Sequence, residues 1–141
     1  MQLEIYQQET EKLVIKNQTI LNEISQKISL DAELSLIEEH AMLHSIQVII
    51  KNAIGKARHI LKLYNSKVPV SAYDLFAGLH SLKVISLDEL QQWKKVVGLR
   101  NAIVHEYMKV DLELLKKVVL NQQYEFVLLF LNAPFEKFYS K

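Results

Sequence analysis

The chain has 141 residues and a formal net charge of +1, and half of its residues are hydrophobic. This length and apolar content fit one folded domain spanning residues 1–141, and they exclude a largely disordered chain. A charge so close to zero excludes a broadly basic nucleic-acid-binding protein but leaves room for a small basic site. Only three glycines and two prolines are present, so tight turns are few, which favours long helices over sheets.

The chain contains no cysteine, which excludes disulfides, thiolate catalysis and cysteine-based zinc sites. Its first nine residues lack the basic start and apolar run of a signal peptide. No apolar run approaches the roughly 20 residues that a membrane span needs. We therefore expect a cytoplasmic protein that does not interact with membranes.

Two long helices are predicted in the first half of the chain. Apolar residues recur at helical spacing from about residue 3 to 28, and again from just after Asp31 to about Tyr64. The stretch 29–31 offers a capping side chain for the second helix. Because the second helix is long and largely apolar on one side, it needs a partner along its whole length.

Three further helices follow. Ser71 and Asp74 form a capping pair for a short helix that ends at about Lys83, and Ser86 with Glu89 forms a capping box for a helix from Leu87 to about His105. A fifth helix is predicted from about Asp111 to Phe130 or beyond. The expected fold is all-α: an antiparallel bundle of four to five helices.

The fourth helix ends in a dense cluster of reactive side chains. Arg100 and Tyr107 are seven residues apart and fall within about 20° of each other around a helix, and Asn101 shares a face with His105. Imidazole transfers protons near neutral pH, and guanidinium binds phosphate oxygens and stabilises charge that develops on them. Together they suffice for RNA cleavage without a metal, and no carboxylate cluster for Mg²⁺ is evident nearby. From spacing alone, ordinary helix-end residues remain the other interpretation.

The stretch 100–107 resembles the R-x4-H-x-Y signature of the HepT toxins, a branch of the HEPN superfamily of helical-bundle ribonucleases. Gly98-Leu99-Arg100-Asn101 is similar to the family's G-F-R-N entry, and residues 104–107 match its V-H-E-Y exit. Val68-Pro69 with Tyr73 and Phe76 also resembles a family segment. The resemblance covers roughly residues 40–131. Where many relatives carry an acidic residue near a histidine of the second helix, this chain has Gly55 and Lys56 before His59.

The resemblance implies a role for each motif residue. Arg100 and His105 are the expected catalytic pair, and Asn101 positions that pair or the substrate. Tyr107 is the expected site of AMP attachment by an MntA-type nucleotidyltransferase antitoxin, as in type VII toxin–antitoxin systems. The resemblance further implies a metal-independent nuclease without cofactor, an RNA substrate, mRNA or tRNA, and a homodimer with its cleft between two motif helices.

Two other functions stay open. The chain could be a non-catalytic HEPN module that pairs with a small nucleotidyltransferase, or a structural bundle that only dimerises. The presence of both Arg100 and His105 favours the enzyme.

Outside the catalytic motif, a glycine, aromatic residues, two histidines and several basic residues also carry expectations. Gly98 within a helix is expected to allow close approach of another helix. Trp93 is expected in the core, and the Phe-rich segment 126–139 packs in the core or makes a subunit contact. His40 and His44 have zinc-binding spacing but no evident third ligand. Basic residues either surround the cleft or are simply solvated: Arg58, Lys62, Lys94, Lys95, Lys109, Lys116 and Lys117.

Overall fold

The computed structural model describes residues 2–105 and 111–139, with side chains for all of these except residues 104 and 105. Within these ranges the chain is entirely helical apart from turns and loops, as predicted. The helices run in chain order as α1 (Gln2–Ser29), α2 (Leu36–Leu63), α3 (Ala72–Ser81), α4 (Leu87–His105), α5 (Leu112–Leu120) and α6 (Tyr124–Asn132), followed by a single 3-10 turn, η2 (Phe135–Lys137).

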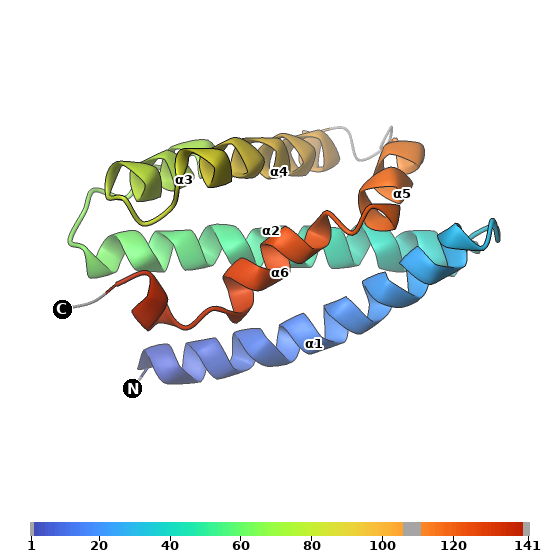
Figure 1. Cartoon of the computed structure of the whole chain (residues 1–141), viewed down its shortest axis with the longest axis horizontal. Coiled ribbons are helices and arrows are strands. Elements are labelled where there is room, and N and C mark those ends of the chain that lie inside the picture. The colour runs from blue at the N-terminus through green and yellow to red at the C-terminus, as the bar shows by residue number, and fades with distance from the viewer. Residues whose placement is uncertain (1, 106–110, 140–141) are drawn as a thin grey trace.

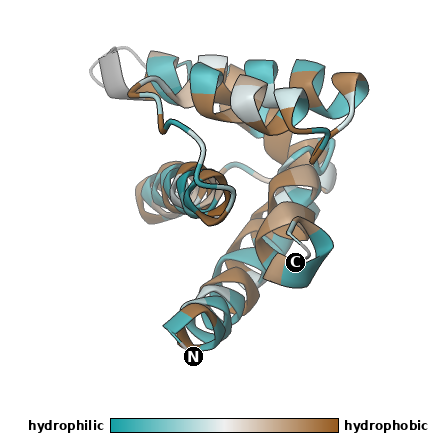
Figure 2. Cartoon of the chain, turned by 90° about the vertical axis from the view of Figure 1, so that its left-hand side faces the viewer, coloured by the Kyte–Doolittle hydropathy of each residue, from teal (hydrophilic) through white to brown (hydrophobic). Residues whose placement is uncertain are grey.

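Helix α2 forms the centre of the bundle and contacts each of the other five helices. In Figure 1, α3 and α4 lie on one side of α2, α1 lies on the other, and α6 crosses in front. Each helix has a hydrophobic and a hydrophilic side, seen as brown and teal in Figure 2.

Although α1 and α2 are 28 residues long, no helix in the described ranges is apolar enough to cross a membrane. The apolar side of α2 is buried from Met42 to Leu61, whereas Leu36 and Ile37 in its first turn are exposed.

The start of α2 differs from the prediction. The helix begins at Leu36 and not just after Asp31, and its N-cap is Ser35, whose hydroxyl accepts from the Glu38 N–H while the Glu38 carboxylate accepts from the Ser35 N–H. Asp31 instead has a φ of 56° in the turn that ends α1. Asp tolerates this left-handed conformation because its short side chain can bond locally. The residues expected to start α2 therefore terminate the preceding helix.

The caps predicted for the third and fourth helices are confirmed. The Ser71 hydroxyl accepts from the Asp74 N–H, and Ser86 and Glu89 form the reciprocal bonds of a capping box. Helix α4 runs from Leu87 to His105, as the sequence predicts.

The fifth predicted helix is in fact two helices. The first, α5, starts close to the expected position, with Asp111 as its N-cap, but it ends at Leu120, and α6 starts at Tyr124 after a turn in which Gln122 has a φ of 54°. The break allows α5 to pack on α1 and α6 to cross α2. A continuous helix could not follow both directions.

The Phe-rich C-terminal segment packs into the core, which was one of its two expected roles. Phe130, Phe135 and Phe138 are buried, and Phe130 meets Trp93 edge-on at 5.0 Å between ring centroids. Trp93 in turn stacks on Phe76 at 4.2 Å. These rings join α3, α4 and α6 into one core.

Lys56 is completely buried at the C-terminal end of α6. Its ammonium group donates to the carbonyl oxygens of Phe130 (2.9 Å), Leu131 (3.1 Å) and Ala133, and to the Oε1 atom of Gln7 (3.1 Å). It also lies 5.1–5.5 Å from the ring centroids of three phenylalanines, Phe130, Phe135 and Phe138. A helix leaves its last carbonyls without partners, so Lys56 and Gln7 cap α6 from two other helices.

Candidate functional site: the C-terminal half of α4

The C-terminal half of α4 carries the motif residues and packs against the core through its buried side. Val97 and Ile103 are buried in the core, whereas Gly98, Asn101 and Ala102 are exposed and Arg100 is half-buried. Alternating buried and exposed positions at helical spacing hold this part of α4 in one rotation. Asn101 therefore faces the solvent, and Arg100 lies at the boundary between the buried and the exposed side of α4.

Arg100 and Asn101 interact directly. The guanidinium of Arg100 donates through Nη1 to the Oδ1 atom of Asn101 at 3.1 Å. No carboxylate lies within ion-pair distance of Arg100 among the described residues. The guanidinium therefore keeps most of its donors for an external anion, and Asn101 restricts where it can point.

The other two predicted site residues are described in part or not at all. The backbone of α4 is helical as far as His105, which places position 105 about 140° around the helix axis from Arg100. The side chain of His105 and all of Tyr107 lie outside the described residues.

The expected basic residues do not all gather at this site. Lys94 and Lys95 are exposed on α4 itself. Arg58 and Lys62 belong to the C-terminal part of α2, which lies at the opposite end of the bundle from the C-terminal end of α4 (Figure 1). Lys116 pairs with Glu113 at 3.3 Å and with Glu39 at 3.9 Å, and Lys109 lies outside the described residues. Lys117 is exposed on α5, so Lys94 and Lys95 are the expected basic residues that lie on the motif helix itself.

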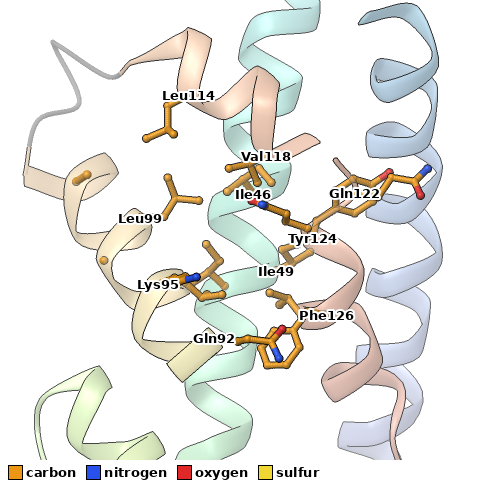
Figure 3. Close-up of a pocket in the computed structure, with 16 residues that line it drawn as sticks. Ile46, Ile49, Gln92, Lys95, Leu99, Leu114, Val118, Gln122, Tyr124 and Phe126 are labelled. Atoms are coloured by element: carbon orange, nitrogen blue, oxygen red, sulfur yellow. The ribbon is translucent and has the colours of Figure 1, made fainter. Parts of the chain in front are cut away.

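An apolar groove of about 620 Å³ borders the motif and was not predicted. It lies between α4, α5 and α6, with α2 as its floor, and we call it the α4–α5 groove. Figure 3 shows Leu99 of α4 and Leu114 of α5 towards one end of the groove and Gln92 with Phe126 at the other, and Ile46 and Ile49 belong to its α2 floor. In the sequence, the amphipathic pattern of residues 112–119 indicates an apolar helix face that could line a groove. The groove itself depends on the break between α5 and α6, which the sequence analysis did not predict.

Gly98 lies at the edge of the groove, in open space. A Cβ atom added at this residue would meet nothing within 4 Å in the described part of the chain. Among the described residues, therefore, no other helix makes the expected close approach to Gly98. Gly98 instead leaves the exposed side of α4 flat next to Arg100 and Asn101.

His59 and Lys56 of α2 pack against other parts of the bundle. The His59 ring packs on Tyr6 at 4.6 Å between centroids, and burial followed by the charges of Lys62 and Arg58 lowers the pKa of His59. Burial also lowers the pKa of Lys56 to about 8. Lys56, which occupies the position where an acid was looked for, caps α6 instead.

His40 and His44 are both exposed, and no group of three His, Asp or Glu residues that could hold a metal occurs among the described residues. The ring of His40 bonds through Nδ1 to the Leu36 carbonyl of its own helix.

The arrangement can bind and polarise a phosphate group. The Arg100 guanidinium, whose bond to the neutral Asn101 side chain lies at the protein surface, can offer two parallel N–H donors to phosphate oxygens. This chemistry suits an anionic substrate such as RNA.

The helical bundle with this motif on α4 defines a HEPN-like protein. The model of the ribonuclease HepT-like family matches residues 14–133, and the chain belongs to that family.

Similar proteins include the mRNA nuclease HepT of Shewanella oneidensis, with 28% identity over 88 residues covering 62% of this chain and 66% of the relative. The tRNA nuclease HepT of Aphanizomenon flos-aquae is 31% identical over 87 residues, covering 61% of this chain and 59% of the relative. The matched region is thus less than two thirds of either relative's length.

The fold is also similar to that of a chain in the crystal structure of a toxin–antitoxin with AMP-PNP. The TM-score is 0.61 at 20% identity, over 84% of this chain and 97% of that chain. This likeness supports the helical fold.

Proposed function

We propose that this protein is a metal-independent ribonuclease toxin whose catalytic pair is Arg100 and His105. The observation that carries the proposal is the Arg100 guanidinium, free of ion pairs among the described residues and restricted by Asn101, on the motif helix of a HepT-like bundle. Two similar proteins carry the name HepT with RNA nuclease activity, one on mRNA and one on tRNA.

The proposed reaction uses the 2′-hydroxyl of RNA as the nucleophile. His105 removes the proton from this hydroxyl, and the oxygen attacks the adjacent phosphorus. Arg100 stabilises the negative charge on the pentacoordinate phosphorus. The bond to the 5′-oxygen of the next nucleotide breaks, that oxygen takes a proton from solvent, and a 2′,3′-cyclic phosphate remains. In this proposed step His105 acts as the base and Arg100 supplies the charge stabilisation, so the step is written without a metal or a cofactor.

We propose that the active protein is a homodimer, joined through the α4–α5 groove. The groove is apolar and open, and Leu114 on its edge is 47% exposed. Covering this surface with a second copy removes apolar area from water and brings the two motif helices close together.

We propose that an MntA-type nucleotidyltransferase neutralises the toxin by attaching AMP to Tyr107. The neighbour of similar fold comes from a toxin–antitoxin crystallised with AMP-PNP, an ATP analogue, which favours a partner of this kind. Each AMP would add negative charge two residues beyond His105, and this charge would compete with RNA for Arg100.

The catalytic proposal is tested with two variants, Arg100→Ala and His105→Ala. Each should lose RNase activity and growth toxicity while keeping the helical circular dichroism spectrum of the wild type. Full activity in the folded His105→Ala protein would contradict the assigned base.

The control by AMP is tested by intact-mass measurement after incubation with the nucleotidyltransferase and ATP. Mass increments of AMP should appear on the wild type and disappear in Tyr107→Phe, which should stay toxic when the antitoxin is co-expressed. Increments that persist in Tyr107→Phe would place the modification elsewhere. No increment on the wild type would favour the alternative, a non-catalytic module that acts by binding the nucleotidyltransferase.

A further inference from the structure

One exposed side of α4 carries a continuous line of polar positions that leads to the motif. The line consists of Gln91, Lys94, Gly98, Asn101 and position 105, and we call it the polar strip of α4. These positions follow one another at steps of three and four residues, so they fall on one side of the helix. Each of the first four is exposed.

Lys94 is the only charged residue on the polar strip among its described side chains. It stands seven residues before Asn101, which puts the two within about 20° around the axis and about 10 Å apart along it. No acidic group pairs with Lys94 within 4 Å among the described residues. The acidic residues of α4, Asp88 and Glu89, lie in its first turn. Lys94 therefore presents an unneutralised ammonium group in line with the motif.

The surface between Lys94 and Asn101 is unobstructed. Gly98 lies between them, and a Cβ atom there would meet nothing within 4 Å in the described part of the chain. At the end of this flat stretch, Asn101 holds the Arg100 guanidinium at 3.1 Å. A chain of phosphates laid along the strip would meet Lys94 first, then Gly98, and then the Arg100–Asn101 pair.

Lys95 offers a matched comparison. It has the same charge, lies one residue further along and is also exposed, but it sits about 100° around the helix and lines the α4–α5 groove. A general attraction between basic residues and RNA would involve Lys94 and Lys95 equally. A defined track along the polar strip would involve Lys94 alone.

We propose that the polar strip is the path of a single-stranded stretch of RNA, and that Lys94 binds a backbone phosphate away from the bond that is cut. This inference rests on the proposed ribonuclease function. Lys94 is a substrate-binding residue in this account and takes no part in the chemical step. Because it contacts phosphate, it contributes affinity without selecting a base sequence.

The test measures binding of a fluorescent single-stranded RNA whose 2′-hydroxyls are methylated, so that the proposed cleavage cannot occur. Lys94→Ala should weaken binding about fivefold and reduce the slope of log K against log salt by about 0.7, the value for one phosphate contact on a single strand. Lys94→Arg should restore both quantities. Because Lys95 lines the α4–α5 groove, Lys95→Ala is compared with the wild type only after gel filtration shows the same oligomeric state; its affinity should then stay within about twofold, since Lys95 would not touch the RNA. With cleavable RNA, Lys94→Ala should raise KM by the same factor and leave kcat unchanged.

The possible failures are distinguishable. If wild type cleaves RNA but Lys94→Ala binds with unchanged affinity and salt slope, the track is overturned and the proposed function stands. Equal losses in Lys94→Ala and Lys95→Ala would also overturn it, because they indicate a diffuse attraction. If wild type neither binds nor cleaves RNA, the proposed function and the track both fall.

Discussion

Arg100 and Asn101 are adjacent in sequence and bonded in space: the guanidinium of Arg100 donates to the side-chain oxygen of Asn101 at 3.1 Å. Neighbouring residues on a helix point about 100° apart, so the long arginine side chain must curve around the helix to make this bond. The bond brings the guanidinium from the half-buried side of α4 towards its exposed polar strip. Asn101 can therefore influence catalysis indirectly, by positioning the Arg100 guanidinium.

Substitutions of Asn101 should therefore affect cleavage by changing what Arg100 is free to bind. Asn101→Asp puts a carboxylate beside the guanidinium, and this charge-assisted bond competes with the RNA phosphate. We expect kcat/KM to fall about tenfold, equivalent to about 1.4 kcal/mol of transition-state stabilisation. Asn101→Ala leaves the guanidinium free but poorly positioned, so its kcat/KM should fall less than that of Asn101→Asp. Activity in Asn101→Asp equal to the wild type would show that Asn101 does not control Arg100.

The α4–α5 groove should control the oligomeric state. Leu114→Glu places a charge on the groove edge and should convert the dimer to a monomer, because burying the carboxylate in an apolar contact is costly. Leu129→Glu is the control, since Leu129 is 69% exposed on α6 and does not line the groove. Light scattering after gel filtration at micromolar concentration gives the mass of each variant. A wild type that is strictly monomeric would refute the dimer, and a Leu114→Glu protein that stays dimeric would place its interface elsewhere.

Replacing the buried Lys56 should lower the free energy of unfolding much more than replacing an exposed lysine. Lys56→Met removes a donor from three carbonyls at the end of α6, and of these only the Leu131 carbonyl keeps another donor, Nε2 of Gln7 at 3.0 Å. We expect the free energy of unfolding to fall by about 3 kcal/mol. Lys51→Met, at an exposed position of the same helix, should change it by less than about 0.5 kcal/mol. Urea unfolding followed by circular dichroism compares the two, and equal stabilities would rule out the capping role.

His59 should make the fold sensitive to acid. Burial and the nearby Lys62 and Arg58 lower its pKa in the folded protein, whereas the unfolded chain keeps the ordinary value of 6.5. As the pH falls below 6.5, the unfolded chain therefore binds a proton before the folded protein does, and stability is lost. The urea midpoint should drop between pH 7.5 and pH 5.5 in the wild type, and His59→Gln should reduce this drop. His44→Gln, at an exposed position, should leave it unchanged. A drop of the same size in His59→Gln would show that other groups cause it.

Much of the helix pattern could be predicted because its signals are local. The caps Ser71, Ser86 and Asp111 lie within three residues of the groups they bond. The start of α2 carries an equally local signal, the capping box of Ser35 and Glu38, which the prediction passed over in favour of Asp31. The break at Gln122 was harder to predict, because left-handed turns usually use glycine or asparagine and Gln122 is neither.

The only residues of the site that could be predicted from the sequence are those that belong to the motif. Arg100 and Asn101 follow from the motif, and the structure adds the bond between them. The groove and the burial of Lys56 depend on contacts between residues far apart in the chain, such as Lys56 with Ala133. No local pattern distinguishes a lysine that caps a distant helix from one that is solvated.

The most direct test of the central claim compares two strands of identical sequence in the presence of EDTA: ordinary RNA, and RNA with methylated 2′-hydroxyls. The account predicts that the wild type cuts only the ordinary strand, leaves 2′,3′-cyclic phosphate ends, and loses this activity in His105→Ala. Cleavage of the methylated strand, or cleavage that EDTA abolishes and Mg²⁺ restores, would contradict a metal-independent reaction through the 2′-hydroxyl.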